Sequence, residues 1–186
     1  MSKPKIQVIL GSIREGRSGE KVANWFMEAI KDNQNAEVEL VDLRDYPLPL
    51  YADSDAVKNR EGAHPIAAVQ TWIDKISEAQ GYVFITPEYN HSYSSAIKNA
   101  IDYAYKAWNA KPLGLVGYGG YAGGSRAVEH LRQVAAELQM YDIRNQIVIP
   151  AVWAAFNAEG KLENHDSHAK NANAVIDKLA QLVGKL

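Results

Sequence analysis

The chain has 186 residues, of which 47% are hydrophobic and 23% charged, and its formal net charge is −2 at pH 7. These values predict a single folded domain over residues 1–186 and no general attraction to nucleic acid or anionic lipid. The sequence contains no cysteine, which excludes disulfides, thiolate catalysis and cysteine metal sites, so any redox chemistry requires a bound cofactor. No apolar run approaches the roughly 18 residues of a membrane span. The polar opening is unlike a signal peptide, so we expect a cytoplasmic protein.

Five short apolar runs rich in Val and Ile are continuous rather than alternating, which is typical of strands buried on both faces. They cover Lys5–Leu10, Val38–Leu43, Gly81–Ile85, Lys111–Gly117 and Ile143–Ile149. The helix-length segments that follow them are Ser18–Lys31, His64–Ala79, Ser95–Trp108, Ser125–Leu138 and Ser167–Val183. This alternation predicts an α/β, flavodoxin-like three-layer sandwich with a five-stranded parallel sheet of order 2-1-3-4-5. Ligands of such sheets bind beyond the carboxyl ends of the strands, which directs attention to the loops after strands one, three and four.

Helix boundaries agree with this pattern, because serine stands where a cap is expected and glycine where the last helix ends. The expected caps are Ser18, Ser94 or Ser95, and Ser125, and Gly184 follows the last helix. The stretch Asp45–Gly62, with two prolines and mixed charge, is the longest irregular connection. It either covers the predicted site or forms an inert surface loop.

The loop after the first strand runs directly into a helix and carries the groups that bind phosphate. Its candidate ligands are Ser12, Arg14, Arg17, Ser18 and Gly19. The loop nearly matches the triphosphatase pattern G-x-x-x-x-G-K-S, but Arg17 stands at the lysine position and no later strand ends in an evident magnesium-binding aspartate. The dinucleotide pattern G-x-G-x-x-G is also missing, so the loop favours a monophosphate end of a ligand. The alternative is a tight turn whose arginines are solvated surface charges.

The segment after the third strand reads T-P-E-Y-N-H-S-Y-S-S-A-I-K-N-A-I-D over residues 86–102. Together with G-S-I-R at residues 11–14, it resembles the NADPH-dependent FMN reductase family, which includes flavin, quinone, azo-dye and chromate reductases. The resemblance implies that the first loop holds the FMN phosphate and that the isoalloxazine ring contacts Pro87, Glu88, Tyr89 and Asn90. The family usually has proline and then glycine or alanine where this chain has Ser94 and Ser95, which puts the stiffness of the loop in question.

The loop after the fourth strand, Gly117–Arg126, contains five glycines within eight positions and opens another helix. Such a loop can direct backbone N–H groups at the pyrimidine edge of a flavin, and the resemblance points to the same region. The candidate cofactor ligands there are Tyr118, Gly119, Gly120 and Tyr121. Taken alone, the loop is equally well a flexible connector.

The resemblance implies an enzyme that uses FMN, takes hydride from NADPH or NADH, and reduces quinones, azo compounds, flavin or similar small acceptors by ping-pong kinetics. It also implies a homodimer or a dimer of dimers. We assign no catalytic residue, because the sequence offers no paired titratable groups of clear purpose. We also assign no metal, because His165 and His168 lack further ligands.

Two other functions are compatible with this strand order, namely an electron carrier and a phosphoacceptor signalling domain. A flavodoxin-type electron carrier would share FMN and the fold, but such carriers are usually strongly acidic, unlike this nearly balanced chain. A phosphoacceptor domain needs an aspartate at the strand end where Thr86 and Pro87 stand. The four tryptophans are expected to be core or interface anchors, and they are Trp25, Trp72, Trp108 and Trp153.

Overall fold

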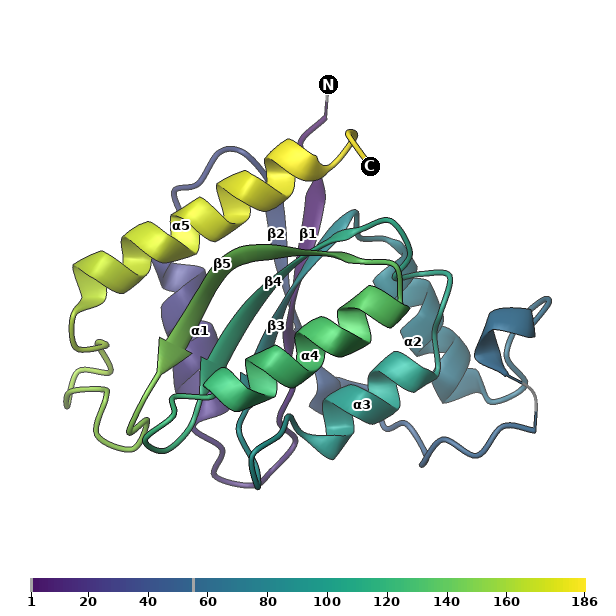
Figure 1. Ribbon diagram of the computed structural model, residues 1–186, viewed down its shortest axis with the longest axis horizontal. Coiled ribbons are helices and arrows are strands. Elements are labelled where there is room, and N and C mark those ends of the chain that lie inside the picture. The colour runs from purple at the N-terminus through teal and green to yellow at the C-terminus, as the bar shows by residue number, and fades with distance from the viewer. Residues whose placement is uncertain (1, 55) are drawn as a thin grey trace.

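The computed structural model describes residues 2–54 and 56–186, which form five parallel strands alternating with five α-helices (Figure 1). The strands are β1 (Lys5–Leu10), β2 (Glu37–Asp42), β3 (Gly81–Pro87), β4 (Pro112–Tyr118) and β5 (Tyr141–Ile149). The helices are α1 (Gly19–Ala29), α2 (Ala67–Ser77), α3 (Ser95–Asp102), α4 (Ser125–Glu137) and α5 (His165–Leu182). Two short 3-10 turns, η1 (Leu43–Asp45) and η2 (Val57–Asn59), lie between β2 and α2.

The strand order is β2-β1-β3-β4-β5 and every pairing is parallel, which confirms the predicted flavodoxin-like topology. Helices α2 and α3 depart most from the predicted lengths, and both are shorter. Helix α2 begins at Ala67 rather than His64, because Pro65 disfavours helical backbone at the residue before it. Helix α3 ends at Asp102 rather than Trp108, because the chain turns there to bury the Trp108 indole, whose Nε1 donates to the Ile101 carbonyl at 3.3 Å.

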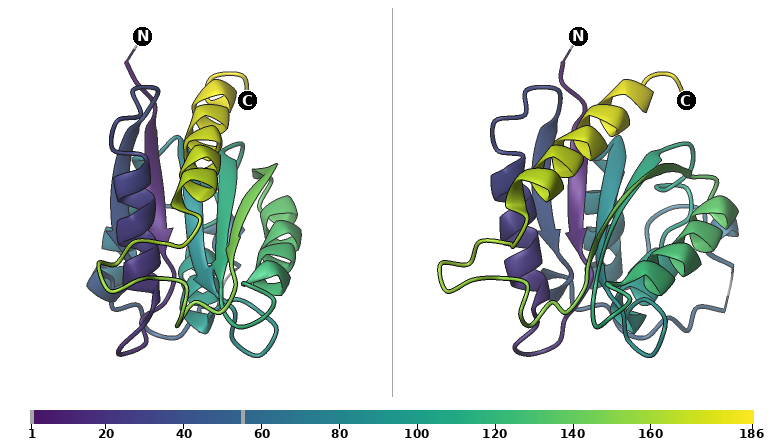
Figure 2. Two further views of the ribbon diagram at one scale, coloured as in Figure 1. Left: turned by 90° about the vertical axis from the view of Figure 1, so that its left-hand side faces the viewer. Right: turned by 60° about the vertical axis from the view of Figure 1, so that its left-hand side comes forward.

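Helices α1 and α5 cover one face of the sheet, and α2, α3 and α4 cover the other (Figures 1 and 2). Each face has its own apolar cluster, one around Phe26 and Val175 and the other around Trp72 and Trp108. All seven residues of β3 and all seven of β4 are buried. The prediction of burial on both faces is wrong for β2 and β5, where exposed and buried residues mix because each is an edge strand with one neighbour.

Three of the four tryptophans confirm the prediction of core positions, since Trp25, Trp72 and Trp108 are buried. Trp153 differs, with 68% of its surface exposed in the segment after β5. His165 and His168 lie in the first turn of α5, where the Trp25 Nε1 donates to His165 Nδ1 at 3.2 Å. Burial lowers the pKa of His168. These imidazoles are therefore packed around an indole.

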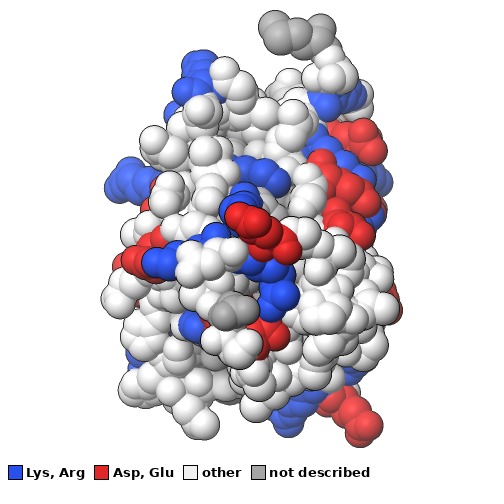
Figure 3. Space-filling model, turned by 90° about the vertical axis from the view of Figure 1, so that its right-hand side faces the viewer, with Lys and Arg blue, Asp and Glu red and all other residues white. Residues whose placement is uncertain are grey.

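The surface charges are mixed in sign, as the small net charge requires. Figure 3 shows Lys, Arg, Asp and Glu intermingled on the face that carries α2 and the connection before it. Ion pairs that join β1, β2 and α2 include Lys5 with Glu39 at 3.1 Å and Lys75 with Glu39 at 2.5 Å. No helix within residues 2–54 and 56–186 is long and apolar enough to cross a membrane. The cytoplasmic location stays a prediction.

The long connection between β2 and α2 packs against α3. The Asn99 side chain donates to the Pro49 carbonyl at 2.7 Å and accepts from the Tyr51 N–H at 2.8 Å. Farther along, the Asp53 carboxylate pairs with Arg60 at 2.6 Å and lies 3.1 Å from Nε2 of the buried His64. These contacts fold the connection back on itself. The two alternatives, cover over the predicted site and an inert surface loop, both stay predictions.

Candidate functional site

Three loops leave the sheet side by side at the carboxyl ends of β1, β3 and β4, at the lower end of Figure 1 and opposite both termini. We call them the β1 loop (residues 11–18), the β3 loop (residues 88–94) and the β4 loop (residues 119–124). The ladder of hydrogen bonds continues into them, from the Gly11 N–H to the Ile85 carbonyl and from the Glu88 N–H to the Tyr118 carbonyl, both at 2.9 Å. The predicted convergence of these loops on one sheet edge is therefore present.

The β1 and β3 loops are joined by direct hydrogen bonds. The hydroxyls of Ser12 and Tyr89 lie 2.8 Å apart and share one such bond, although the two residues are 77 positions apart. The Ser94 hydroxyl donates to the Gly11 carbonyl and accepts from the Ile97 N–H at 3.2 Å, which confirms Ser94 as the cap of α3. Ser94 thus restrains the loop by hydrogen bonding at the position where the family usually has proline.

The β3 loop contains a tight turn at its tip. Asn90 and His91 both have positive φ, 49° and 70°, and Tyr89 and Ser92 exchange backbone hydrogen bonds of 2.8 and 3.0 Å. This is the geometry of a two-residue hairpin turn of type I′. Non-glycine residues in this region cost about 1–3 kcal/mol each and persist only where neighbouring contacts hold them. The turn fixes the direction in which Tyr89 leaves the sheet.

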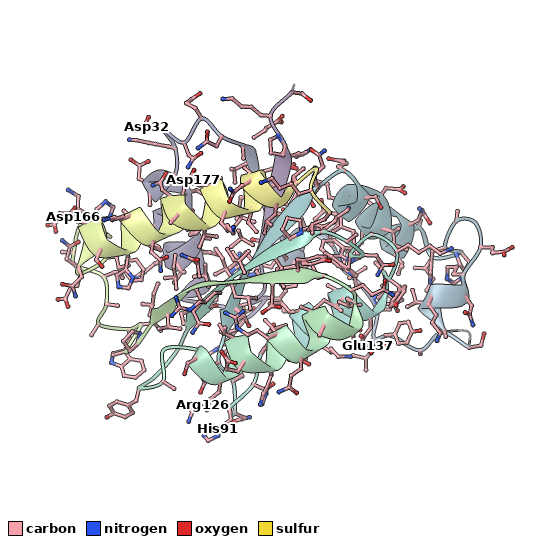
Figure 4. All side chains as sticks on the ribbon, turned by 45° about the horizontal axis from the view of Figure 1, so that its top comes forward. Asp32, His91, Arg126, Glu137, Asp166 and Asp177 are labelled. Atoms are coloured by element: carbon pink, nitrogen blue, oxygen red, sulfur yellow. The ribbon has the colours of Figure 1, made fainter. Side chains whose placement is uncertain are left out.

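Glu88 joins the β3 loop to Arg126 in the first turn of α4, directly after the β4 loop. The Glu88 carboxylate accepts from Arg126 Nε at 2.5 Å and from the Arg126 backbone N–H at 3.2 Å. Only 5% of the Glu88 side chain is exposed. In Figure 4, Arg126 at the start of α4 and His91 in the turn after β3 lie at the same end of the molecule. Glu88 therefore links the β3 loop to α4 and places a negative charge at the positive end of a helix dipole.

The β4 loop is an ordered extension of the sheet. The N–H groups of Ala151 and Val152 donate to the carbonyls of Gly120 and Gly119, both at 3.0 Å. Gly124 has φ +88°, and a Cβ there would lie 2.3 Å from the Tyr118 nitrogen, so only glycine fits. Because Gly124 occupies the N-cap position of α4 in this left-handed conformation, the predicted cap at Ser125 is wrong. These hydrogen bonds indicate an ordered loop and argue against the alternative of a flexible connector.

The two arginines of the β1 loop have different surroundings. The Arg17 guanidinium is 2% exposed, pairs with both oxygens of Asp42, and donates to the Ser12 carbonyl. Burial alone would raise the pKa of Asp42, but the bonds from Arg17 and from the Arg44 N–H hold it below its ordinary value. Arg14 is exposed, and its guanidinium has no partner among the described residues. Arg17 therefore holds the β1 loop in place through buried contacts. Of these two arginines, Arg14 is the one whose charge is available to a ligand.

The sequence did not point to three residues that organise the site, namely Asp42, Arg44 and Arg126. Arg44 donates to the backbone carbonyls of Ile13 and Arg14 and pairs with Glu20 at 2.8 Å. The available signal for Asp42 was its position at the carboxyl end of the second strand. For Arg126 it was the first turn of the helix after the glycine-rich loop.

The start of α1 offers unpaired hydrogen-bond donors. Ser18 stands at the predicted N-cap position with φ −67° and ψ −14°, but its side chain makes no capping hydrogen bond. No described residue accepts from the backbone N–H groups of Gly19, Glu20 and Lys21. The Tyr118 hydroxyl, buried beside Gly19, also lacks a partner among the described residues. Free N–H groups, an unpaired hydroxyl and the free Arg14 together suit an anion such as phosphate.

The remaining predicted residues line the rim of this edge. Pro87 is buried and lies opposite Tyr118 in the β3–β4 register. Tyr89 is 36% exposed, Tyr121 is 97% exposed, and the Trp153 ring lies against Gly120. The structure therefore brings the predicted residues of all three loops to one edge, with Arg17 turned inward.

Comparisons with known proteins agree with this arrangement. The family model described as NADPH-dependent FMN reductase matches residues 4–154. An NAD(P)H-dependent FMN reductase of Schizosaccharomyces pombe is 40% identical over 137 residues, which cover 74% of this chain and 68% of the relative. An NAD(P)H:quinone oxidoreductase of Solanum tuberosum is 36% identical over 143 residues, which cover 75% of this chain and 71% of the relative.

Among solved structures, the flavoenzyme FerB of Paracoccus denitrificans, an NAD(P)H:(acceptor) oxidoreductase, has a TM-score of 0.76 at 24% identity. The alignment covers 98% of each chain, and this likeness concerns the fold alone. The protein is thus of the flavodoxin-like α/β class. The chain belongs to the NADPH-dependent FMN reductase family. This confirms the predicted family and the predicted enzyme class, an NAD(P)H-dependent FMN reductase or quinone oxidoreductase.

Proposed function

We propose that the protein holds FMN as a resident cofactor across the β1, β3 and β4 loops and uses it to reduce quinone-like acceptors with NADPH or NADH. The observation that carries this proposal is that the three loops are bonded to one another while donors at the start of α1 stay free. A rigid edge with unpaired donors is what an anionic, planar ligand requires.

Each loop has a distinct task in this proposal. The phosphate is bound by Ser12, Arg14 and the N–H groups that begin at Gly19, with Ser18 adjoining them. Arg17 acts as a positioning residue, because its guanidinium is committed to Asp42 and the Ser12 carbonyl. The flat ring rests along Pro87–Asn90, and the β4 loop presents Gly119, Gly120 and Tyr121 to its polar edge. When bound, FMN supplies the redox chemistry, taking a hydride from the nicotinamide and passing two electrons to the acceptor.

The chain's own residues bind and orient, and none is assigned a proton transfer. The hairpin turn at Asn90 and His91 and the pair of Glu88 with Arg126 hold the wall for the ring at a fixed angle. A fixed wall would leave the opposite face of a bound flavin open to the donor and then to the acceptor, and we expect ping-pong kinetics for that reason. Quinones are the first acceptors to test, because the Solanum tuberosum relative is described as a quinone oxidoreductase. Azo compounds and free flavin come next.

We also propose a homodimer, or a dimer of dimers, with the site near the partner subunit. Large apolar side chains are exposed on segments beside the site, including Ile13 at 55%, Tyr121 at 97% and Trp153 at 68%. Exposed aromatic groups near one another favour an interface. Light scattering coupled to size-exclusion chromatography would measure the mass against the 20.6 kDa of one chain. A single species of that mass would contradict this part of the proposal.

The central test is the absorption spectrum of the purified protein after incubation with FMN and gel filtration. We expect a retained flavin spectrum that bleaches when NADPH is added without oxygen and returns when a quinone follows. Initial rates at varied NADPH and quinone should give parallel double-reciprocal lines. A protein that takes up no FMN would contradict the proposal. A protein that keeps FMN but leaves NADPH and NADH unoxidised would be a flavodoxin-type electron carrier instead.

A further inference from the structure

Tyr118, the last residue of β4, carries a buried hydroxyl with an unusual position. Its ring packs in the apolar cluster on the α1 and α5 side of the sheet, and only 4% of the residue is exposed. The hydroxyl reaches across to the first residue of α1, since a Cβ added to Gly19 would lie 2.5 Å from it. The last residue of β4 thus places its side-chain hydroxyl beside the start of α1.

By distance and angle that hydroxyl makes no hydrogen bond among the described residues, although burial, which raises its pKa, is partly opposed by the nearby Ser12 side chain. The neighbouring hydroxyls of Ser12 and Tyr89 are bonded to each other at 2.8 Å. An unsatisfied buried hydroxyl lowers the stability of a protein, and native structures rarely keep one without a role. Burial raises the pKa of Tyr118, so the group stays protonated and can act only as a neutral donor or acceptor at ordinary pH.

A second buried tyrosine shows that burial in this sheet does not by itself leave a tyrosine hydroxyl without a hydrogen bond. Tyr82 in β3 is fully buried, and its hydroxyl donates to the Ile76 carbonyl at 2.5 Å and also lies 3.1 Å from the Ala107 carbonyl. Lys111 Nζ donates to the same oxygen at 3.1 Å. A tyrosine of comparable burial is therefore fully paired away from the site, whereas Tyr118 is unpaired beside it.

The groups around the Tyr118 hydroxyl indicate which kind of ligand would accept its hydrogen bond. The unpaired N–H groups of Gly19, Glu20 and Lys21 begin the adjacent helix, where the helix dipole favours negative charge. Among the described residues, none of these N–H groups makes a hydrogen bond. The missing partner is therefore an anion with several acceptor oxygens, as in a phosphate monoester.

We propose that the Tyr118 hydroxyl donates a hydrogen bond to the phosphate of FMN, which links β4 to the phosphate end of the site. This inference rests on the proposed function and deepens it, because it moves Tyr118 from the ring edge suggested by its loop to the phosphate cradle. Gly19 is part of the same device, since its lack of a side chain leaves room for the hydroxyl.

The test compares FMN with riboflavin, which has the same ring and no phosphate, in the wild-type protein and in Tyr118→Phe. Binding to the flavin-free protein is measured by the change in flavin fluorescence. We expect Tyr118→Phe to weaken FMN about tenfold or more, as loss of a hydrogen bond to a charged group does, and to leave riboflavin affinity unchanged. The flavin-free variant should melt at or above the wild-type temperature, because the substitution removes an unpaired hydroxyl.

Tyr82→Phe is the matched control. It removes an equally buried hydroxyl that is fully paired, so it should lower the melting temperature and leave the affinities for FMN and riboflavin unchanged. If Tyr118→Phe folds poorly, Gly19→Ala provides a second route. The added methyl group displaces the hydroxyl and should also weaken FMN, and this loss should be smaller when Phe replaces Tyr118.

The outcomes separate this inference from the proposed function. Equal FMN affinity in the wild type and Tyr118→Phe, with FMN bound by both, would overturn the role of Tyr118 and leave the flavin site standing. An equal loss of FMN and riboflavin affinity would also overturn it, because the hydroxyl would then act on the ring. A wild-type protein that binds neither flavin would overturn the proposed function and this inference with it.

Discussion

Among the described residues, polar groups at the amino ends of the strands are paired with one another, whereas several at the carboxyl ends are not. At the amino ends of β1 and β2, Lys5 and Lys75 both pair with Glu39, and Lys5 also pairs with Glu78 at 2.5 Å. At the carboxyl ends, the Arg14 side chain and the N–H groups that begin α1 have no partner among the described residues. The difference indicates that the carboxyl edge is organised for a ligand at a cost in stability, whereas the amino edge is organised for stability alone.

The largest effect on this comparison is expected from removing two of the proposed phosphate ligands. Replacing Ser12 and Arg14 together by alanine should weaken FMN about a hundredfold while the fold is kept, because a charge-assisted bond and a hydroxyl contact are lost. Binding is measured by flavin fluorescence and the fold by circular dichroism. Arg144→Ala is the control, since it removes an exposed arginine from β5. Unchanged flavin affinity in the double variant would count against the β1 loop as the phosphate site.

The next effect concerns Arg17, the inward arginine of the same loop. Asp42→Asn should lower the free energy of unfolding by about 2 kcal/mol, less than the roughly 3–5 kcal/mol of a fully buried pair because a quarter of the Asp42 side chain is exposed. The measurement is urea unfolding at pH 7. Asp102→Asn should change stability far less, because its partner Lys98 is 44% exposed whereas Arg17 is 2% exposed. Equal effects of the two substitutions would show that the Arg17 pair carries no special weight.

The pH dependence of that pair has a definite sign. The pKa of Asp42 is lower in the folded protein than its ordinary value, so its contribution is present above about pH 4 and is lost as the pH falls through the folded value. The difference in unfolding free energy between the wild type and Asp42→Asn should therefore shrink below about pH 4. A constant difference down to pH 2 would contradict the assigned role of the carboxylate.

The fold was predictable because the hydrophobic pattern of each segment indicates its secondary structure. Parts of the site were not predictable, because they depend on contacts between segments that are far apart in the sequence. Continuous Val- and Ile-rich runs specified the central strands, and loop composition specified which turns bind a ligand. The pairing of Arg17 with Asp42 depends on the parallel register that sets Leu10 opposite Asp42, which no pattern within either segment reveals. Likewise, Gly124 displaced Ser125 from the cap because of a close approach to the Tyr118 backbone, a contact made only after folding.

Lys111 lies just before β4, at the amino end of the sheet. Unlike Lys5 and Lys75, it contacts an aromatic ring there instead of a carboxylate. Its Nζ lies 5.3 Å from the centre of the Tyr82 ring, and burial lowers its pKa to about 8. A lysine whose folded pKa is below its unfolded value makes stability rise with pH between the two values, here from about 8 to the ordinary 10.5. Lys111→Met should flatten that rise and stabilise the protein at pH 7 by less than about 1 kcal/mol, given partial solvent screening.

Urea unfolding at pH 7, 8, 9 and 10 measures this smallest effect. Lys106→Met is the control, because it removes a lysine of the same loop region for which no buried aromatic contact is present among the described residues. Flavin affinity should be equal in both variants and the wild type, since Lys111 lies at the amino end of β4, away from the ligand edge. A rise in stability with pH that survives in Lys111→Met would assign it to another group. A change in FMN affinity would mean that the two ends of the sheet are coupled, contrary to the separation on which the comparison depends.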